Sequence, residues 1–388
     1  MSNWEVITGD CIDGMARIDA GIVQTCVTSP PYWGLRDYGN AGQIGLEESP
    51  ELYVARMVDV FRGVRRILRD DGTVWLNLGD SYAANRSYQV TDNKHVDVGN
   101  NGASKVPPGL KQKDLIGIPW RVAFALQADG WYLRSEIVWH KLNPMPESVT
   151  DRPTKAHEQV FLLTKSPRYY YDADAIAEQA AGVKGGASFG KQSHDATGTG
   201  QQSRTYDRPD YATRNKRSVW TIPTKNFSGA HFAVMPEALV EPCILAGTSE
   251  RGRCPACGAG WSRVAERTAM VLKRSERTHE LGRTRSSGTM IKPPSSVTTG
   301  WQPSCTCDAG DPVPCVVFDP FTGSGTVGAV AVRLGRSFVG CEMNPEYVRL
   351  AEDRIGAEDI YAPGGLFGAT VTRTREEPAD LFATETRQ

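Results

Sequence analysis

The sequence predicts an α/β fold, in which a sheet is covered by helices, built as one layered domain with loop-rich insertions. Segments with strand and helix periodicity alternate before residue 170 and again after residue 313, which is typical of a sheet with helices on its faces. Between these parts, 181–217 consists mainly of Gly, Ser, Thr, Gln and Asp, a composition that cannot bury a core. The 388 residues would allow two or three domains, but alternation on both sides of an irregular middle favours one.

The N-terminal part alternates expected strands and helices. The expected strands cover 4–8, 23–28, 73–78, 135–140 and 159–164. A helix is expected over 52–68, where apolar residues recur at helical spacing, and Asp71-Gly72 is expected to end it. A second helix is expected over 118–128, and the polar stretch 82–113, rich in Asn and Gly, is expected to be a loop.

The C-terminal part resumes the alternation after the irregular middle. Strands are expected over 313–318 and 337–341, and helices over 325–334 and 345–355. Residues 361–388 have the composition of a polar tail.

Charge is nearly balanced, with 44 Lys and Arg against 45 Asp and Glu. This excludes a histone-like polycation and an acidic disordered chaperone, but it leaves nucleic acid open as a partner because local positive charge is sufficient. Two segments are locally basic: 204–217 has five basic and two acidic residues, and 262–292 has eight basic and three acidic ones. Each is either a solvated loop or a contact for DNA phosphates.

Targeting signals are not evident in the sequence. The first residues lack a basic start followed by an apolar run, so we expect no signal peptide. No apolar stretch approaches the roughly 18 to 20 residues that a membrane-spanning helix needs. The expected location is the cytoplasm.

A glycine-rich turn between an expected strand and an expected helix is the main cofactor signal. Gly323, Gly325 and Gly328 formally match the dinucleotide pattern G-x-G-x-x-G. Asp319 at the strand end argues against a dinucleotide, because its carboxylate would repel a pyrophosphate and would instead pair with a cation such as the α-ammonium of S-adenosylmethionine. Glu342 closes the next strand, where it can accept both ribose hydroxyls of either cofactor. A purely structural glycine turn is the alternative.

A rigid turn, Ser29-Pro30-Pro31-Tyr32, follows an expected apolar strand. The two prolines fix the backbone and remove two amide donors, so the turn presents the Ser29 hydroxyl and the Pro30 carbonyl as acceptors beside the Tyr32 ring. Such a site suits a flat ring with an exocyclic amine, whose N–H groups donate while the ring stacks on Tyr32. Holding both hydrogens out of the ring plane favours a tetrahedral nitrogen that attacks a methyl group. The alternative is an ordinary Pro-Pro turn.

Together these motifs resemble the β class of DNA amino-methyltransferases. Ser29 to Tyr32 precedes Asp319-Pro-Phe-Thr-Gly-Ser-Gly-Thr326, as the catalytic motif precedes the cofactor loop in that class. Further matching segments are 7–10, 72–80, 139–149, 152–158 and 231–237. The resemblance implies a Rossmann-like, mostly parallel seven-stranded sheet with one antiparallel strand and a circularly permuted motif order. The strand near residue 313 would be the first, and the N-terminal strands would follow it in space.

The resemblance also implies roles for individual residues. Ser29 and Pro30 would orient the amine of a flipped base, Pro31 would hold the turn, and Tyr32 would stack on the base. The residues implied to hold S-adenosylmethionine are Asp10, His231, Pro236, Asp319, Phe321, Gly323, Ser324, Gly325, Thr326, Glu342 and Asn344.

In the class that these motifs resemble, members with serine in the first motif position usually methylate cytosine N4, and those with Asp or Asn usually methylate adenine N6. The resemblance therefore favours N4 of cytosine as the methyl acceptor, with N6 of adenine as the alternative. Methylation at cytosine C5 is rejected, because it needs a thiolate in Pro-Cys-Gln, whereas Ile follows Cys243 and Val follows Cys315. Hydride transfer is disfavoured by Asp319. The alternative from another class is a non-catalytic DNA-binding module.

Four of the nine cysteines are grouped, as Cys254-Pro-Ala-Cys257 and Cys305-Thr-Cys307. Thiolates at such spacing form tetrahedral zinc sites, so a structural zinc is expected, with His279 as a possible substitute ligand and unligated thiols as the alternative. The other five are expected to be reduced and to pack in the interior: Cys11, Cys26, Cys243, Cys315 and Cys341.

These observations divide the chain as follows: a catalytic half (1–171), a target-recognition region (172–225), a cofactor-closing segment (226–250), a zinc-binding insertion (251–310), a cofactor-binding half (311–360) and a tail (361–388). The expected partner is double-stranded DNA. A cognate restriction endonuclease acting on the same site is a further candidate, and both monomer and dimer remain open. The resemblance implies a bacterial or phage-encoded protein.

Overall fold

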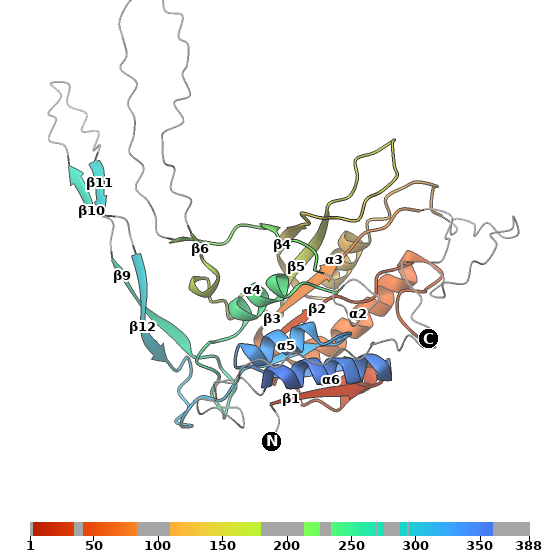
Figure 1. Ribbon diagram of the computed structural model, residues 1–388. Helices are drawn as coiled ribbons and strands as arrows, with labels where there is room; N and C mark the ends of the chain where they lie inside the picture. Colours follow the sequence, from red (N-terminus) through yellow and green to blue (C-terminus); the bar gives the residue numbers. More distant parts are fainter. Residues whose placement is uncertain are drawn as a thin grey trace, which may run out of the picture.

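The computed structural model contains a mixed sheet of eight strands within the residues it describes (Figure 1). Those residues are 3–34, 42–83, 109–179, 213–225, 234–268, 271–274, 288–292 and 295–359. The strand order across the sheet is β1 (Trp4–Thr8), β14 (Ser337–Glu342), β13 (Val316–Asp319), β2 (Val23–Thr28), β3 (Leu68–Leu78), β5 (His157–Thr164), β4 (Tyr132–His140) and β8 (Val219–Thr221). Only β5 pairs antiparallel with its neighbours in this sheet, so the other seven strands run in one direction.

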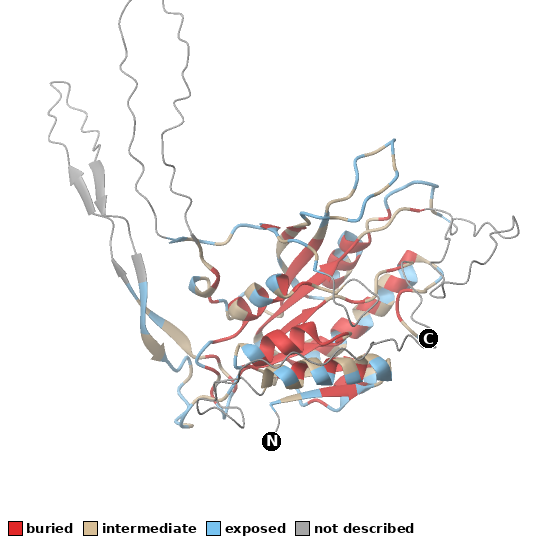
Figure 2. Ribbon diagram, viewed as in Figure 1, coloured by how far each residue is buried: buried red, intermediate tan, exposed pale blue. Residues whose placement is uncertain are grey.

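Helices cover both faces of the sheet. Strand residues alternate between two apolar cores: Val74 and Leu76 face one, and Trp75 between them faces the other. The first core is covered by α1 (Cys11–Ala16), α2 (Pro50–Ile67) and α3 (Ile118–Ala128). The second is covered by α4 (Glu237–Gly247), α5 (Thr326–Arg333) and α6 (Pro345–Asp359). Figure 2 shows the buried residues concentrated in the sheet and on the helix faces turned toward it.

Helix α2 illustrates how the sequence forms these elements. Ser49 caps its N-terminus by accepting a hydrogen bond from the Leu52 amide (3.3 Å), and Pro50 occupies the first turn. A stripe of fully buried side chains at helical spacing then faces the sheet, including Tyr53, Met57 and Phe61.

Most expected elements are confirmed, but their boundaries differ. The strand expected at 73–78 begins at Leu68, so Asp71-Gly72 lies inside β3 instead of separating it from α2. An irregularity in the pairing with β2 accommodates the extra residues: Val23 pairs with Leu68, whereas Thr25 pairs with Thr73.

The expected number and order of strands need correction. The short strand β8 adds an eighth strand beside β4, and its three residues carry too little periodicity to be predicted. Strands β2 and β3 follow β13 in space as expected, but β1 lies at the far edge beside β14. Helix α4, which contains Pro242, was not expected from the sequence.

The described parts of the basic segment 262–292, residues 262–268, 271–274 and 288–292, form strands, whereas a solvated loop was one of the two interpretations of the segment. Strands β9 (Ser262–Thr268) and β12 (Ser295–Gln302) form an antiparallel ribbon, and β10 (Val271–Arg274) and β11 (Gly288–Lys292) form a second antiparallel pair farther along. Figure 1 shows both pairs projecting from the body of the molecule. The ribbon is anchored at its start, where Arg263 contacts the buried Asp172 (2.9 Å) and Glu250 (2.9 Å).

Several expectations lie wholly or partly outside the described residues. These are the basic stretch 204–212, most of the loop 82–113, and the tail. A short antiparallel pair, β6 (Glu178–Gln179) with β7 (Thr213–Arg214), flanks the undescribed part of the middle region. Across the described residues, none of the helices is both long and apolar enough to cross a lipid bilayer.

Candidate active site

Polar residues gather at the carboxyl ends of the parallel strands. Ser29 follows β2, Asp319 ends β13, Glu342 ends β14 and Asp10 follows β1. Strands β2 and β13 are hydrogen-bonded neighbours although they lie almost 300 residues apart in the chain, with Cys26 paired to Phe318. The two motifs predicted to act together therefore lie side by side.

The Ser29 to Tyr32 turn has a fixed backbone. The Tyr53 hydroxyl of α2 donates a hydrogen bond to the Pro31 carbonyl (3.0 Å). Gly45, with a φ of 104°, packs so closely that an added Cβ would lie 3.1 Å from the Tyr32 carbonyl oxygen. The contacts with Tyr53 and Gly45 thus hold the turn in place, which suits a site that must orient a reacting group.

The Tyr32 hydroxyl is the centre of a hydrogen-bond network. It lies 3.1 Å from Ser29 Oγ and donates to Glu158 Oε2 at 2.7 Å, with Asn77 Oδ1 at 3.2 Å. Lys141 forms an ion pair with the other oxygen of Glu158, and Asn77 Nδ2 donates to Glu158 Oε2 (3.1 Å). Burial and the nearby Glu158 carboxylate raise the pKa of Tyr32 well above its usual 10, so its hydroxyl stays protonated.

Asn77, Lys141 and Glu158 were not predicted as individual site residues. Asn77, Lys141 and Glu158 belong to the segments 72–80, 139–149 and 152–158 that carry the resemblance, but nothing in the sequence indicates that their side chains meet. They reach the site because β5 runs antiparallel, so that its first residues lie beside the last residues of β3 and β4.

Asp319 is a buried carboxyl group, with 3 % of its surface exposed. Its Oδ1 accepts hydrogen bonds from the Thr28 hydroxyl (2.7 Å) and the Phe321 amide (3.0 Å). Burial raises its pKa from the ordinary 3.8 to about 7, and the Glu342 charge adds to this, while the two hydrogen bonds oppose it. A cationic group placed beside Asp319 would favour its ionised form.

Glu342 holds the glycine turn in place. Its carboxylate accepts from the Gly323 amide (2.8 Å) and the Asn344 amide (2.8 Å), and burial raises its pKa. Gly325 caps α5 in the left-handed region, at a φ of 77°, and an added Cβ there would lie 2.8 Å from Ala351 Cα of α6. The turn between β13 and α5 therefore packs directly on the neighbouring helix.

Some of the remaining residues predicted to bind the cofactor lie in this turn, and the others lie elsewhere in the fold. Ser324 and Thr326 are buried in the turn and lie against Arg354, which donates to Thr326 Oγ1 at 2.9 Å. Asp10 caps α1 by accepting from the Ile12 amide (2.7 Å) and pairs with Arg56 (3.3 Å). Phe321 packs at the border of the first core. Pro236 is buried and precedes α4, whereas His231 lies outside the described residues.

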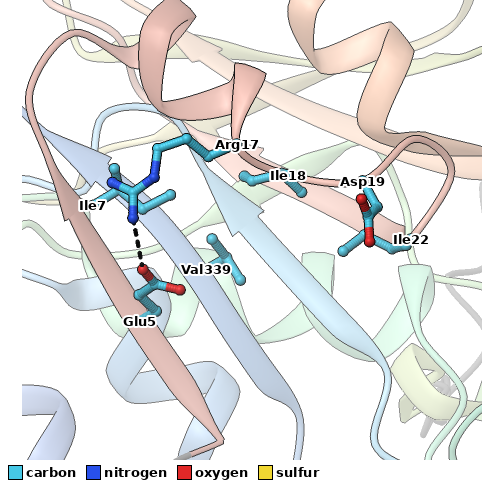
Figure 3. Close-up of a pocket in the computed structure, with 7 residues that line it drawn as sticks. All are labelled: Glu5, Ile7, Arg17, Ile18, Asp19, Ile22 and Val339. Carbon is cyan, nitrogen blue, oxygen red and sulfur yellow. Dashed lines mark ion pairs between the residues drawn. The ribbon is translucent and has the colours of Figure 1, made fainter.

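A surface hollow of about 210 Å³ lies away from these residues (Figure 3). It is lined by Glu5, Ile7, Arg17, Ile18, Asp19, Ile22 and Val339. Arg17 and Glu5 form an ion pair across it (3.6 Å), and both side chains are about 60 % exposed. None of the predicted site residues lines this hollow.

The four grouped cysteines meet as predicted, with all four Sγ atoms within 4.8 Å of one another. The first pair forms a tight turn, in which the Gly258 amide donates to the Cys254 carbonyl (2.8 Å) and Gly258 has a φ of 73°. Hydrogen bonding from the Cys257 amide lowers the pKa of the Cys254 thiol to about 7. The five other cysteines are buried, as expected, and His279 lies outside the described residues.

The cysteine cluster lies at the amino ends of the parallel strands, whereas the candidate active site lies at their carboxyl ends. Arg253 exchanges two backbone hydrogen bonds with Val313, just before β13 (2.7 and 2.9 Å). The Gly258 carbonyl accepts from Gln24 at the start of β2 (3.4 Å), and the Cys257 carbonyl accepts from Arg69 near the start of β3. The cluster is therefore joined to three central strands where they begin.

Comparison with known proteins gives consistent matches. Residues 23–254 and 313–353 match a family model described as DNA methylase. The chain is 42 % identical to the Type II methyltransferase M.Cfr9I of Citrobacter freundii over 90 % of its length and 87 % of that protein. It is 39 % identical to the Type II methyltransferase M.SmaI of Serratia marcescens, over 90 % of each. Among solved structures, the PvuII DNA methyltransferase (cytosine-N4-specific) matches 91 % of this chain and 86 % of that one, with a TM-score of 0.50 and 16 % identity, a likeness of fold.

Proposed function

Because this chain belongs to the DNA methylase family, we propose that it transfers a methyl group from S-adenosylmethionine to N4 of a flipped cytosine in double-stranded DNA. The chain is a site-specific DNA amino-methyltransferase. The target base and the residues that contact the coenzyme are what we propose. The observation that carries the inference is the placement of Ser29 and Asp319 at the ends of adjacent parallel strands. Transfer needs the amine and the methyl donor to meet, and neighbouring strand ends provide this.

Three features of the cofactor half support S-adenosylmethionine. When bound, this coenzyme supplies an electrophilic methyl group on its sulfonium. Asp319 would pair with its α-ammonium group, and the buried environment favours such a pair once the carboxyl group ionises. Glu342 would accept the ribose hydroxyls, and the turn 321–326 would leave room for the coenzyme because Gly323 and Gly325 lack side chains.

Serine in the first motif position supports cytosine N4. Ser29 Oγ and the Pro30 carbonyl would accept the two N–H groups of the exocyclic amine, and Tyr32 would contact the base. The same acceptors also fit the amine of adenine, so N6-adenine methylation is the second candidate. Flipping the base out of the duplex would bring either amine to this site.

Analysis of nucleosides from cells that express the protein tests the target base. We expect N4-methylcytosine in their DNA by mass spectrometry, and single-molecule sequencing would give the recognition sequence at the same time. The variant Ser29→Ala should lose most methyl transfer and keep coenzyme affinity, whereas Ser135→Ala, on β4, should remain active. Accumulation of N6-methyladenine instead would establish the second candidate, and full activity of Ser29→Ala would reject the assignment.

A structural zinc ion in the cysteine cluster is our second proposal. Four thiolates around zinc at about 2.3 Å lie roughly 3.8 Å apart, a distance that falls within the 4.8 Å limit on the separations of the four Sγ atoms here. A hydrogen bond with Cys257 and repulsion among the thiolates raise the pKa of Cys307 to about 12, an effect that a divalent cation would reverse. Four protein ligands leave no position for water, so the ion would serve structure only.

Metal analysis tests this proposal. We expect one zinc per chain in purified protein, and loss of it in Cys254→Ser and in Cys305→Ser. The buried Cys243 lies outside the cluster, so Cys243→Ala should retain the metal. Purified protein without stoichiometric metal, prepared in the absence of chelators, would end the proposal.

The segment roles are also proposals. The region 172–225 would recognise the target sequence, and the basic segment 262–292 would contact DNA phosphates. Because its relatives are Type II methyltransferases, the protein would protect a site from a cognate endonuclease.

A further inference from the structure

We propose that Ser29, Tyr32 and Glu158 form a hydrogen-bonded relay that takes up the proton which the target amine loses on methylation. The inference rests on the proposed function, because it assumes that Ser29 contacts that amine. Methylation leaves the amine nitrogen cationic, and this nitrogen must then lose a proton. The relay gives this proton a path of two hydrogen bonds, of 3.1 and 2.7 Å.

The donors and acceptors of this chain of hydrogen bonds have a defined direction. The Tyr32 hydroxyl has one proton, and it donates this proton to Glu158 Oε2. Tyr32 Oη is therefore free to accept from the Ser29 hydroxyl, 3.1 Å away. Ser29 Oγ in turn keeps its lone pairs for an N–H group of the base. All bonds point from the substrate toward Glu158.

Glu158 is fixed as the end of the relay by two other side chains. Lys141 pairs with Oε1, and Asn77 Nδ2 donates to Oε2 at 3.1 Å. Asn77 is itself fixed, since its amide also donates to the Gln159 carbonyl (3.1 Å). The side chain of Glu158 is 14 % exposed and that of Lys141 20 %. The ion pair and the amide thus hold the Glu158 carboxyl group with Oε2 directed at Tyr32.

Methyl transfer and proton loss involve the following bonds and protons. The amine nitrogen forms a bond to the methyl carbon while the bond from sulfur to that carbon breaks, and the nitrogen becomes cationic. Its proton moves to Ser29 Oγ, the Ser29 hydroxyl proton moves to Tyr32 Oη, and the Tyr32 hydroxyl proton moves to Glu158 Oε2. Ser29 and Tyr32 end neutral and Glu158 ends as a carboxylic acid. The exocyclic amine of a base gives up its conjugation with the ring when its nitrogen is tetrahedral and cationic, and it regains that conjugation on losing the proton. This cation is therefore a far stronger acid than a carboxylic acid, so the transfer is downhill.

The charged groups around Glu158 are compatible with this role. Lys141 at the end of β4 is its ion-pair partner, and Lys155, just before β5, is also close enough to interact with it. Burial lowers the pKa of Lys155. Asp80, which follows β3, is engaged in capping α3 through the Gly117 and Ile118 amides (both 3.0 Å). Glu158 is thus the carboxylate that contacts Tyr32.

Single-turnover methylation of a short duplex, at saturating S-adenosylmethionine and DNA, tests the relay. Glu158→Gln and Tyr32→Phe should each slow methyl transfer about 10²-fold, within the usual range for a lost proton acceptor. The double variant should be no slower than either single one, because the two residues act in one path. Glu158→Asp should regain part of the rate.

Two measurements separate the relay from a structural role. Infrared difference spectra of the free protein should show a carboxylate band that disappears in Glu158→Gln and shifts in Tyr32→Phe, independently of activity. Coenzyme affinity, DNA affinity and the thermal midpoint should stay within the range of Glu136→Gln, a matched change on the neighbouring strand β4. Variants that weaken DNA binding but keep the wild-type rate at saturation would overturn the relay, as would multiplicative effects in the double variant.

Failure of the relay and failure of the proposed function give different results. If Ser29→Ala keeps full activity, the assignment of the target site is wrong. If Ser29→Ala is inactive while Glu158→Gln keeps the wild-type rate, the site stands and only the relay is wrong.

Discussion

Asp319 connects the charge of a single residue to the function of the site. The residue is buried at the end of β13, and its pKa of about 7 means that a large fraction of the free protein carries a proton there at neutral pH. A cationic ligand favours the ionised carboxylate. Binding of S-adenosylmethionine should therefore release this proton.

The first prediction is a pH dependence of coenzyme affinity. Below pH 7 the affinity for S-adenosylmethionine should rise about tenfold per pH unit, because the fraction of ionised Asp319 rises by that factor, and it should level off above about pH 7.5. Isothermal titration calorimetry between pH 5.5 and 8.5 measures this. Asp319→Asn should bind weakly at every pH, and Asp59→Asn on the surface of α2 should follow the wild type. A flat wild-type profile would contradict the prediction.

The second prediction concerns the cost of burying Asp319. Its pKa is higher in the folded protein (about 7) than in the unfolded chain (3.8), so the folded state binds the proton more tightly. Asp319 therefore lowers the free energy of unfolding as pH rises from about 4 to 7. Asp319→Asn should be more stable than the wild type at pH 8, by roughly 4 kcal/mol at most, and equally stable near pH 4. Urea unfolding at both pH values tests this, and a less stable variant at pH 8 would refute it.

At the scale of elements, the turn between β13 and α5 is tied to the packing of α6. Gly325 begins α5 in a left-handed conformation and leaves no space for a side chain beside Ala351. Gly335, which follows α5, has almost the same φ (75°) but no atom within 4 Å of an added Cβ. The two glycines thus differ in packing and not in backbone conformation.

This pair supplies the third prediction. Gly335→Ala should reduce the free energy of unfolding by about 1 kcal/mol, the usual cost of a left-handed Ala. Gly325→Ala should cost roughly 2 kcal/mol more, because α6 must move away from the turn, and it should also weaken coenzyme binding. Urea unfolding and calorimetry of both variants measure these effects. Equal losses in the two variants would mean that contact with α6 is unimportant.

The elements also show how far the sequence alone leads. Ser29, Asp319 and Glu342 could be predicted because each follows a periodic apolar strand, and parallel strands bring such residues to one edge. Glu158 and Asn77 could not, since their meeting depends on β5 running antiparallel beside β3. The sequence also could not reveal that Asp10 caps α1, because a carboxylate after a strand fits either a cap or a ligand contact.

At the scale of the whole molecule, the cysteine cluster and the active site lie at opposite ends of the same parallel strands. The cluster contacts the beginnings of β2, β3 and β13, whereas Ser29 and Asp319 lie at the ends of β2 and β13. Spacing of the cysteines predicted the cluster but not its position. Its contacts lie with the core strands, so the cluster should affect stability more than chemistry.

The fourth prediction follows from this separation. Removal of the metal, or the change Cys305→Ser with Cys307→Ser, should lower the midpoint of thermal unfolding by roughly 5–10 °C. At 20 °C the affinity for S-adenosylmethionine should remain within about twofold of the wild type. Differential scanning fluorimetry and calorimetry give the two values. A loss of coenzyme affinity that parallels the loss of stability would show that the cysteine cluster and the coenzyme site are coupled.

The sheet order has a consequence for synthesis of the protein. Strand β13 lies between β14 and β2, so β2 keeps an unpaired edge until residues beyond 319 have left the ribosome. A nascent chain that holds the Ser29 turn therefore exposes an apolar strand for most of translation, and a prematurely terminated chain would keep it exposed. Such fragments should be captured by chaperones or degraded, so that only complete chains accumulate and reach DNA.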